Sequence, residues 1–234
     1  MFQGLIDKVV DFNGDALRNI PSIVLPGGLL DDLSPDPRAR AFGEALLSQK
    51  REREDFVSPI IMQPFNCGIA LSDTSHGGFS TRFGDAKRFG VWYGSLDLLT
   101  TIYETVYHFK KRITNMLTQV DEEVVSERRV FRVHVEGILI DLRGKYRDFP
   151  KLVDKKDYSF SNAVGAYLHD NGQNGLLVES ARYHDGINVA AFKPDILSNP
   201  RHHSYLIYRW VPGTSAVRIE KTPGRTWKVL HETN

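Results

Sequence analysis

The chain has few cysteines, no long apolar run and almost no net charge. Its 234 residues include one cysteine, Cys67, which excludes an intrachain disulfide and a zinc site built from cysteines. No stretch approaches the roughly 20 apolar residues that a membrane-spanning helix needs. The apolar run of residues 1–10 is interrupted by Asp7 and Lys8, which is untypical of a signal peptide. We therefore expect a cytoplasmic protein without a membrane segment.

Positive and negative charges are nearly balanced. The chain holds 30 Lys and Arg residues against 29 Asp and Glu residues, so its formal net charge is +1. A surface that binds nucleic acid usually carries a clear basic excess. The basic run from Lys110 to Arg112 is typical of a solvated helix end. Direct binding to nucleic acid is therefore not expected.

The first part of the chain differs in character from the rest. Residues 19–36 contain several prolines and glycines, which favour an irregular connection. Residues 38–55 are rich in Ala, Leu, Glu, Lys and Arg, which favour a helix. We interpret residues 1–56 as a helical N-terminal extension and residues 57–234 as the functional domain.

From residue 57 onward, helix and strand patterns are mixed. The clearest helix is expected over residues 95–117, capped by Ser95, and a second over residues 159–170. Because helices and strands do not alternate regularly, we expect an α+β fold: a mostly antiparallel sheet with flanking helices. Short apolar or alternating runs predict the strands, at residues 60–62, 68–71, 79–83, 90–93, 129–142, 175–178 and 188–192, and within residues 203–230 around turns at Pro212-Gly213 and Pro223-Gly224.

Four polar residues stand out against this pattern. Arg82 lies on a strand-like piece, Tyr93 closes another, and Glu104 lies in the expected helix away from its apolar stripe. These three follow one another at intervals of 11 positions. Much later, Ser180 comes just after an apolar strand and is followed by Ala181 and Arg182.

In this order the segments resemble the RES domain family, named for its arginine, glutamate and serine. The family shows a strand with glycine, arginine and an aromatic residue, then a strand ending in tyrosine, then a helix bearing glutamate. A strand closing in a serine follows later, and then an apolar strand ending in phenylalanine. Here the corresponding residues are Arg82, Tyr93, Glu104 and Ser180, with residues 188–192 as the closing strand. The resemblance covers about residues 59–210.

The resemblance implies a fold similar to that of the diphtheria-toxin type of ADP-ribosyltransferase. It implies a toxin that cleaves the nicotinamide–ribose bond of NAD by phosphorolysis or hydrolysis and so depletes cellular NAD. NAD would be the substrate, inorganic phosphate a candidate co-substrate, and an Xre-type antitoxin the cognate protein partner. No further cofactor and no metal are implied. Two alternatives stay open: transfer of ADP-ribose to a protein target, and a non-catalytic binding module with a degenerate NAD site.

The residue types suit this chemistry. Breaking the nicotinamide–ribose bond develops positive charge on the ribose, which the Glu104 carboxylate would stabilise. The planar guanidinium of Arg82 would bind the pyrophosphate through paired, charge-assisted hydrogen bonds, with Arg182 as a further substrate-binding residue. Tyr93 would stack on a ring or use its hydroxyl. Ser180 would position a ribose or phosphate oxygen.

Each of these residues also has a purely structural interpretation. Arg82 would pair with Asp85, Tyr93 would be a core aromatic, Glu104 would lie on a solvated helix face, and Ser180 would cap a strand. One departure from the family concerns an arginine that many members carry on their first strand. Residues 59–64 contain none, so that charge is either missing or supplied elsewhere, with Arg88 and Arg182 as the candidates.

Overall fold

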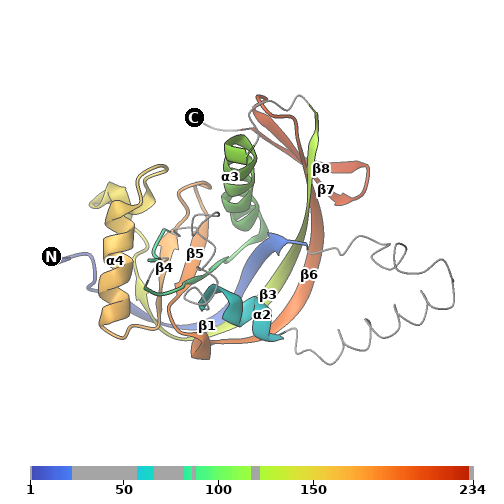
Figure 1. The fold of residues 1–234 in the computed structure, drawn as a ribbon. Coiled ribbons are helices and arrows are strands. Elements are labelled where there is room, and N and C mark those ends of the chain that lie inside the picture. Colours follow the sequence, from blue (N-terminus) through green and yellow to red (C-terminus); the bar gives the residue numbers. More distant parts are fainter. Residues whose placement is uncertain (1, 23–56, 66–81, 86–87, 117–121, 232–234) are drawn as a thin grey trace.

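The fold is built on one strongly curved eight-stranded sheet (Figure 1). A computed structural model describes residues 2–22, 57–65, 82–85, 88–116 and 122–231. The strand order is β1-β2-β5-β4-β3-β6-β7-β8, with β1 also paired to β3. All neighbouring strands run antiparallel except β3 and β4, which are parallel. The strands are β1 Val9–Pro21, β2 Trp92–Ser95, β3 Val124–Asp141, β4 Gly175–Glu179, β5 Ile187–Ala191, β6 Leu197–Trp210, β7 Ala216–Thr222 and β8 Arg225–His231.

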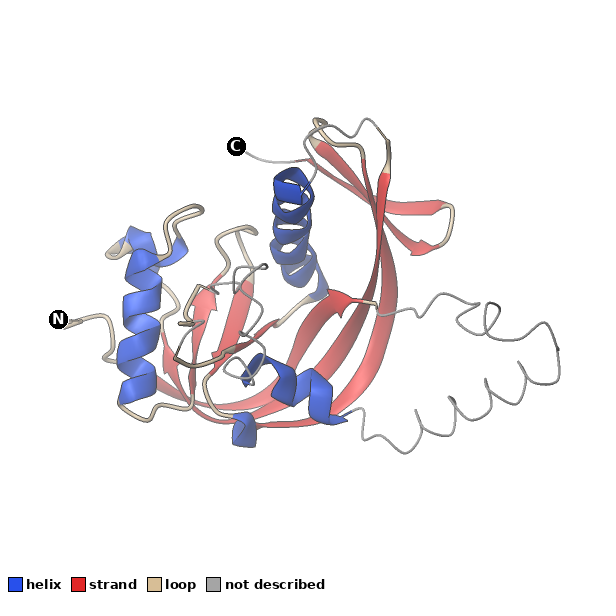
Figure 2. Cartoon of the chain, in the orientation of Figure 1, coloured by secondary structure: helices blue, strands red, loops and turns tan. Residues whose placement is uncertain are grey.

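Within the described residues, three α-helices pack on this sheet (Figure 2): α2 Val57–Met62, α3 Leu98–Met116 and α4 Ser159–Asp170. Short 3-10 turns lie at Gln63–Phe65, Lys145–Arg147, Pro150–Val153 and Pro194–Ile196. The expected α+β class with a mostly antiparallel sheet is confirmed. None of the described helices is both long and apolar enough to cross a membrane.

The core divides into clusters that follow the helices. Helix α3 buries its predicted stripe, including Ile102, Val106 and Phe109, against the half of the sheet that ends in β8. Helix α4 packs through Val164 and Leu168 on the other half, where β4 and β5 lie. Successive side chains of a strand point to opposite faces, so β4 contributes to two clusters. Leu176 and Val178 pack in the cluster of α4, and Leu177 packs in a separate cluster on the other face. The two long helices therefore pack on different parts of one sheet. Strands β4 and β5 pack under α4, and residues at the end of β4 and on β5 also contact α3.

The helical interpretation of the N-terminal segment is wrong over Val9–Pro21, which forms strand β1. This strand pairs antiparallel with β3 along its whole length, from Val9 opposite Ile140 to Pro21 opposite Arg128. Its β-branched residues and Gly14 favour a strand over a helix, but the decisive partner is more than 100 residues away in sequence. The helix expected over residues 38–55 lies outside the described residues.

Smaller predictions also change. Residues 60–62 belong to helix α2 and not to a strand. The prediction was wrong because a run of three apolar residues is too short to distinguish the period of a helix from that of a strand. Ser95 ends strand β2, and the cap of α3 is instead Asp97, just before the helix, whose Oδ1 accepts a 2.9 Å hydrogen bond from the Thr100 amide. Arg82 lies in a turn, and residues 68–71 and 79–81 lie outside the described residues.

The remaining elements agree with the prediction. Helix α4 has the expected bounds, and β3, β4 and β5 lie within one to five residues of theirs. The tail forms antiparallel strands turned at Gly213 and Gly224, whose φ angles of 85° and 78° are readily adopted only by glycine.

Candidate functional site

The site is centred on Glu104, on the face of α3 that looks toward β4 and β5. Its side chain is buried, with 9% of the residue exposed, so the interpretation as a solvated helix residue is wrong. Oε1 accepts a 2.7 Å hydrogen bond from the Ser180 hydroxyl and a 2.8 Å bond from the Asn188 side-chain amide. The structure therefore brings two of the predicted residues into direct contact. Both bonds end on Oε1, and Oε2 has no hydrogen bond within the described part of the chain.

Asn188 is a site residue that the sequence analysis missed. It is fully buried on β5, and its Oδ1 accepts a 2.7 Å hydrogen bond from the Ser95 hydroxyl. Ser95, Asn188, Glu104 and Ser180 thus form a continuous chain of hydrogen bonds across β2, β5, α3 and the end of β4. The sequence did contain a signal for it, because Asn188 is the one side-chain amide in the otherwise apolar run Ile187–Ala191. A buried strand seldom carries such an amide without a hydrogen-bond partner.

Ser180 has a fixed orientation at the end of β4. Its Oγ accepts hydrogen bonds of 3.0 Å from the backbone amides of both Arg182 and Tyr183. The loop is closed by the Ser180 amide, which donates to the Gly186 carbonyl at 2.7 Å. Gly186 lies so close to helix α3 that a Cβ there would stand 2.3 Å from Thr100 Oγ1. Close packing of this loop on α3 is what brings Ser180 to Glu104.

Tyr93 lies on β2, beside the carboxylate. Burial raises the pKa of its phenol far above the usual value, and the nearby negative charge of Glu104 raises this pKa further. Arg82 lies near enough to oppose part of that shift. The Tyr93 hydroxyl is therefore neutral at physiological pH and remains a hydrogen-bond donor.

Arg82 is buried, with 5% of the residue exposed. Its Nη1 donates to the carbonyls of Leu152 at 3.2 Å and Asp154 at 2.7 Å, and its Cζ lies 4.4 Å from the centre of the Tyr158 ring. Its Nη2 is buried and has no hydrogen-bond partner in the described part of the chain. A buried donor without a partner is costly, so this nitrogen is suited to an incoming acceptor.

Arg182 converges on the same tyrosine. Its Nη2 donates to the Tyr158 hydroxyl at 3.2 Å and to the Lys155 carbonyl, and its Cζ lies 3.4 Å from the Tyr107 ring centre. Its Nε is buried without a partner among the described residues. Tyr158, just before α4, was not predicted, because nothing local in the sequence marks a residue that joins two distant arginines.

Two further arginines, Arg88 and Arg18, have contacts of their own. Arg88 forms a two-pronged, exposed ion pair with Asp170 of α4, at 2.7 and 2.9 Å, so its proposed role as a replacement charge is wrong. The first strand of the fold is β1, and it does carry an arginine, Arg18. Its Nη1 donates to the Tyr93 carbonyl at 3.1 Å, its Nε is buried without a partner in the described chain, and burial lowers its pKa to about 10. Arg18 thus supports the backbone of Tyr93.

His108 follows Glu104 by one helical turn and was also missed as a site residue. Desolvation lowers the pKa of its imidazole, and the positive charges of Arg182 and Arg82 lower it further against the opposing charge of Glu104. His108 therefore lies within electrostatic reach of three of the predicted residues.

Together the site offers one fixed carboxylate, two arginines with unused donors and a neutral phenol. Such a set suits a substrate with anionic oxygens at one end and developing positive charge at the other.

Comparison with known proteins gives a family match and matches among solved structures. The family model described as the RES domain matches residues 62–211, a range that contains Arg82, Tyr93, Glu104, Ser180 and Arg182. A search of solved structures finds the M. tuberculosis MbcT-MbcA toxin–antitoxin complex, at a TM-score of 0.48 and 12% sequence identity, covering 87% of each chain. No curated protein sequence matches the chain.

Proposed function

The chain belongs to the RES domain family, and we propose that it is an enzyme that cleaves the nicotinamide–ribose bond of NAD by phosphorolysis or hydrolysis. The observation that carries this proposal is the buried Glu104 carboxylate, held at Oε1 by Ser180 and Asn188. A carboxylate fixed in this way does not need to reorganise when positive charge develops beside it, and this preorganisation is what makes electrostatic stabilisation effective.

In the proposed reaction the bond between the ribose C1 and the nicotinamide nitrogen breaks, and its electron pair goes to that nitrogen. Glu104 stabilises the resulting cationic ribose, and its Oε2 is placed to accept a hydrogen bond from a ribose hydroxyl. An oxygen of phosphate or water then forms the new bond to C1. With water, one proton is released to the solvent.

Arg82 and Arg182 bind the pyrophosphate in this proposal. Each carries a buried nitrogen without a partner in the described chain, Nη2 of Arg82 and Nε of Arg182, and both contact Tyr158. A pyrophosphate would supply acceptor oxygens to these donors and neutralise the two positive charges. Tyr93 donates from its neutral hydroxyl or stacks on a ring.

Ser180 is proposed as a positioning residue and not as a nucleophile. Its hydroxyl proton is directed at Glu104, and its oxygen already accepts two backbone amides. Those bonds use the lone pairs that an attack on the ribose would need. Its place next to the carboxylate instead fixes Glu104 and borders the ribose.

The test uses the purified full-length chain with NAD and follows nicotinamide release by chromatography, in buffers with and without inorganic phosphate. Release that depends on phosphate, with a phosphorylated ADP-ribose product, supports phosphorolysis, and release without phosphate supports hydrolysis. Labelled NAD added with a cell lysate tests transfer to a protein, which the same residues could perform. NAD binding without any release under these conditions would reject catalysis in favour of a binding module.

We also propose that the protein acts as a toxin controlled by an Xre-type antitoxin, as expected for the family. Expressing the chain alone should then lower cellular NAD and arrest growth, and co-expressing the antitoxin should reverse both effects. The matched control is Glu104→Gln, expressed to the same level. Unchanged NAD in cells that contain folded wild-type protein would contradict this role. The fold of the diphtheria-toxin type stays a prediction.

A further inference from the structure

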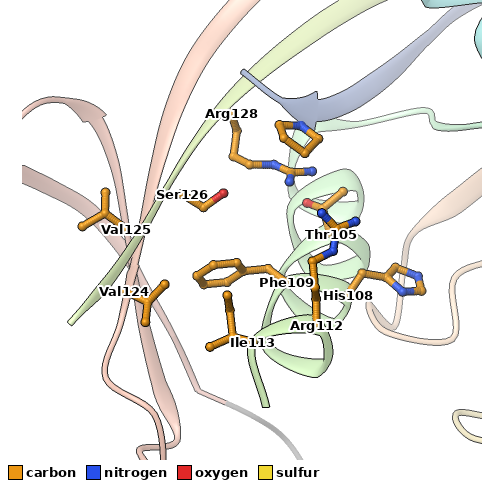
Figure 3. A pocket seen from close by; sticks show the side chains of 10 residues that line it. Thr105, His108, Phe109, Arg112, Ile113, Val124, Val125, Ser126 and Arg128 are labelled. Atoms are coloured by element: carbon orange, nitrogen blue, oxygen red, sulfur yellow. The ribbon is translucent and has the colours of Figure 1, made fainter. Parts of the chain in front are cut away.

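A cavity of about 210 Å³ lies between α3 and the beginning of β3, next to the end of β1. Figure 3 shows Phe109 and Ile113 of α3 directed across it toward Val124 of β3. Arg112 and Arg128 supply the charged part of the lining, and His108 lies at the side of the helix. The cavity therefore combines an apolar wall with two guanidinium groups.

Both arginines that line this cavity are positively charged. None of the ten residues that line it is acidic. Burial lowers the pKa of Arg128, and the nearby positive charge of Arg112 lowers it further. Figure 3 shows the Arg112 side chain directed along the helix toward Thr105 and Arg128. The positive charge of Arg112 thus disfavours the charged form of Arg128, and a bound anion would favour it.

Arg128 is held in place before any ligand arrives. It is buried, and its Nε and Nη2 donate to Oδ1 and the backbone carbonyl of Asn19, at 3.0 and 3.1 Å. Its Cζ lies 5.5 Å from the ring centre of the buried Tyr208. Arg112, by contrast, lies on the exposed surface of α3. The cavity thus has one buried cation, held by Asn19, and one cation at the exposed surface of α3.

We propose that this cavity is an anion site for a phosphate or carboxylate group carried on a small apolar body, such as one aromatic ring. The two arginines would bind the anionic oxygens through charge-assisted hydrogen bonds, and Phe109, Ile113 and Val124 would contact the apolar body. The volume is below the roughly 300–1,000 Å³ of pockets that enclose whole drug-sized ligands, so a single ring with its acid group is the size that fits. This site lies apart from the Arg82 and Arg182 pair and does not rest on the function proposed above.

An anion bound in the cavity would change the electrostatics of the Glu104 site through His108. This residue lines the cavity and also lies within electrostatic reach of Glu104 and Arg182. A bound anion would favour the protonated imidazole of His108. This effect is opposite to that of Arg82 and Arg182, whose positive charges lower the pKa of His108. The His108 ring is therefore a built-in reporter for the cavity.

The experiment titrates phenyl phosphate into the full-length chain, with calorimetry for the affinity and NMR of the histidine ring protons for the location. We expect phenyl phosphate to bind and to shift the His108 signal, and phenol and inorganic phosphate to bind at least tenfold more weakly. Arg112→Gln should weaken phenyl phosphate about tenfold to a hundredfold, as expected for one charge-assisted contact. The control, Arg225→Gln on β8, removes the same charge from an exposed residue and should leave the affinity unchanged.

A second variant does not depend on removing an arginine. Ser126 lines the cavity, so Ser126→Glu would place a carboxylate beside Arg112 and Arg128. It should abolish phenyl phosphate binding while keeping or raising the melting temperature. Absence of wild-type binding would overturn the proposal. So would binding that survives Arg112→Gln and Ser126→Glu but is lost in Arg182→Gln, because the ligand would then occupy the Glu104 site.

Discussion

The hydroxyl of Ser180 donates a 2.7 Å hydrogen bond to Oε1 of Glu104, although 76 positions separate the two residues in the chain. Asn188 reaches the same oxygen from the neighbouring strand, at 2.8 Å. Two donors on one oxygen fix the carboxylate in a single orientation and leave its other oxygen for a ligand. The arrangement also means that Glu104 is held by residues that themselves depend on β4 and β5.

Removing the Asn188 amide should therefore damage both folding and catalysis. Asn188→Ala leaves the buried Glu104 with one donor and the buried Ser95 hydroxyl without its acceptor. We expect the free energy of unfolding to fall by about 1–3 kcal/mol, the usual cost of unsatisfied buried polar groups. We also expect kcat for NAD cleavage to fall more than KM rises. Denaturant unfolding and steady-state kinetics measure the two effects.

The control for this variant is Asn13→Ala, an exposed asparagine on β1, whose stability should stay within about 0.5 kcal/mol of wild type. If Asn188→Ala lost stability but kept full kcat, Asn188 would be a core residue with no part in positioning the carboxylate.

Much of the site was predictable because its residues lie in separate elements with their own local patterns. The equal spacing of Arg82, Tyr93 and Glu104 and the later Ser180 were visible in the sequence. The contact between Glu104 and Ser180 was not, because it depends on the loop before Gly186 packing on Thr100 of α3. Tyr158 was missed for the same reason: only tertiary packing brings Arg82 and Arg182 to it.

The N-terminal part of the fold shows a different limit. Val9–Pro21 is a strand because β3 offers it a complete antiparallel partner, from Ile140 to Arg128. Local composition carries little information about such a distant pairing, and strand propensity depends strongly on what the strand packs against. The misassigned strand at residues 60–62 also placed the first strand of the sheet too late in the chain, because the first described strand is β1, which carries Arg18.

Arg82→Lys should weaken NAD binding about tenfold to a hundredfold, because lysine keeps the charge but loses the planar fork. Lysine is a more specific test than alanine, because Arg82 also donates to the carbonyls of Leu152 and Asp154. A lysine keeps a positively charged donor near these carbonyls, whereas alanine would remove it. Calorimetry gives the affinity, and a melting curve gives the stability of the same sample. Arg88→Lys, which alters an exposed ion pair with Asp170, should leave both unchanged. Equal NAD affinity in the two variants would return Arg82 to a structural role.

Asp141, at the end of β3, makes the fold sensitive to acid. Its buried carboxylate accepts from Nε and Nη2 of Arg143 at 2.7 and 2.9 Å and pairs with Lys8 at 2.7 Å. Hydrogen bonds from Arg143, and then from Lys8, hold the pKa of Asp141 well below its usual range. Because the folded-state pKa is depressed, this stabilisation is fully present above the unfolded pKa of about 3.9 and is lost as the pH falls toward the folded value.

Asp141→Asn should therefore lower the free energy of unfolding by on the order of 3 kcal/mol at pH 7. The difference from wild type should shrink as the pH falls below about 4. Denaturant unfolding at a series of pH values measures this, with Asp148→Asn, an exposed carboxylate on the following turn, as the control. A difference that stayed constant down to pH 2 would mean that packing, and not charge, explains the loss.

Glu104→Gln tests the proposed chemistry most directly. Glutamine keeps the volume and can place its carbonyl oxygen where Oε1 accepts from Ser180 and Asn188. The fold should therefore survive, with a melting temperature close to that of wild type. Without the negative charge, the cationic ribose loses its main stabiliser, so kcat for NAD cleavage should fall by about 10²- to 10³-fold. NAD affinity should change little, because this interaction strengthens mainly in the transition state. Turnover, NAD affinity and a melting curve on one preparation settle the point. Full turnover in a well-folded Glu104→Gln protein would remove Glu104 from the reaction and, with it, the observation on which the proposed function rests.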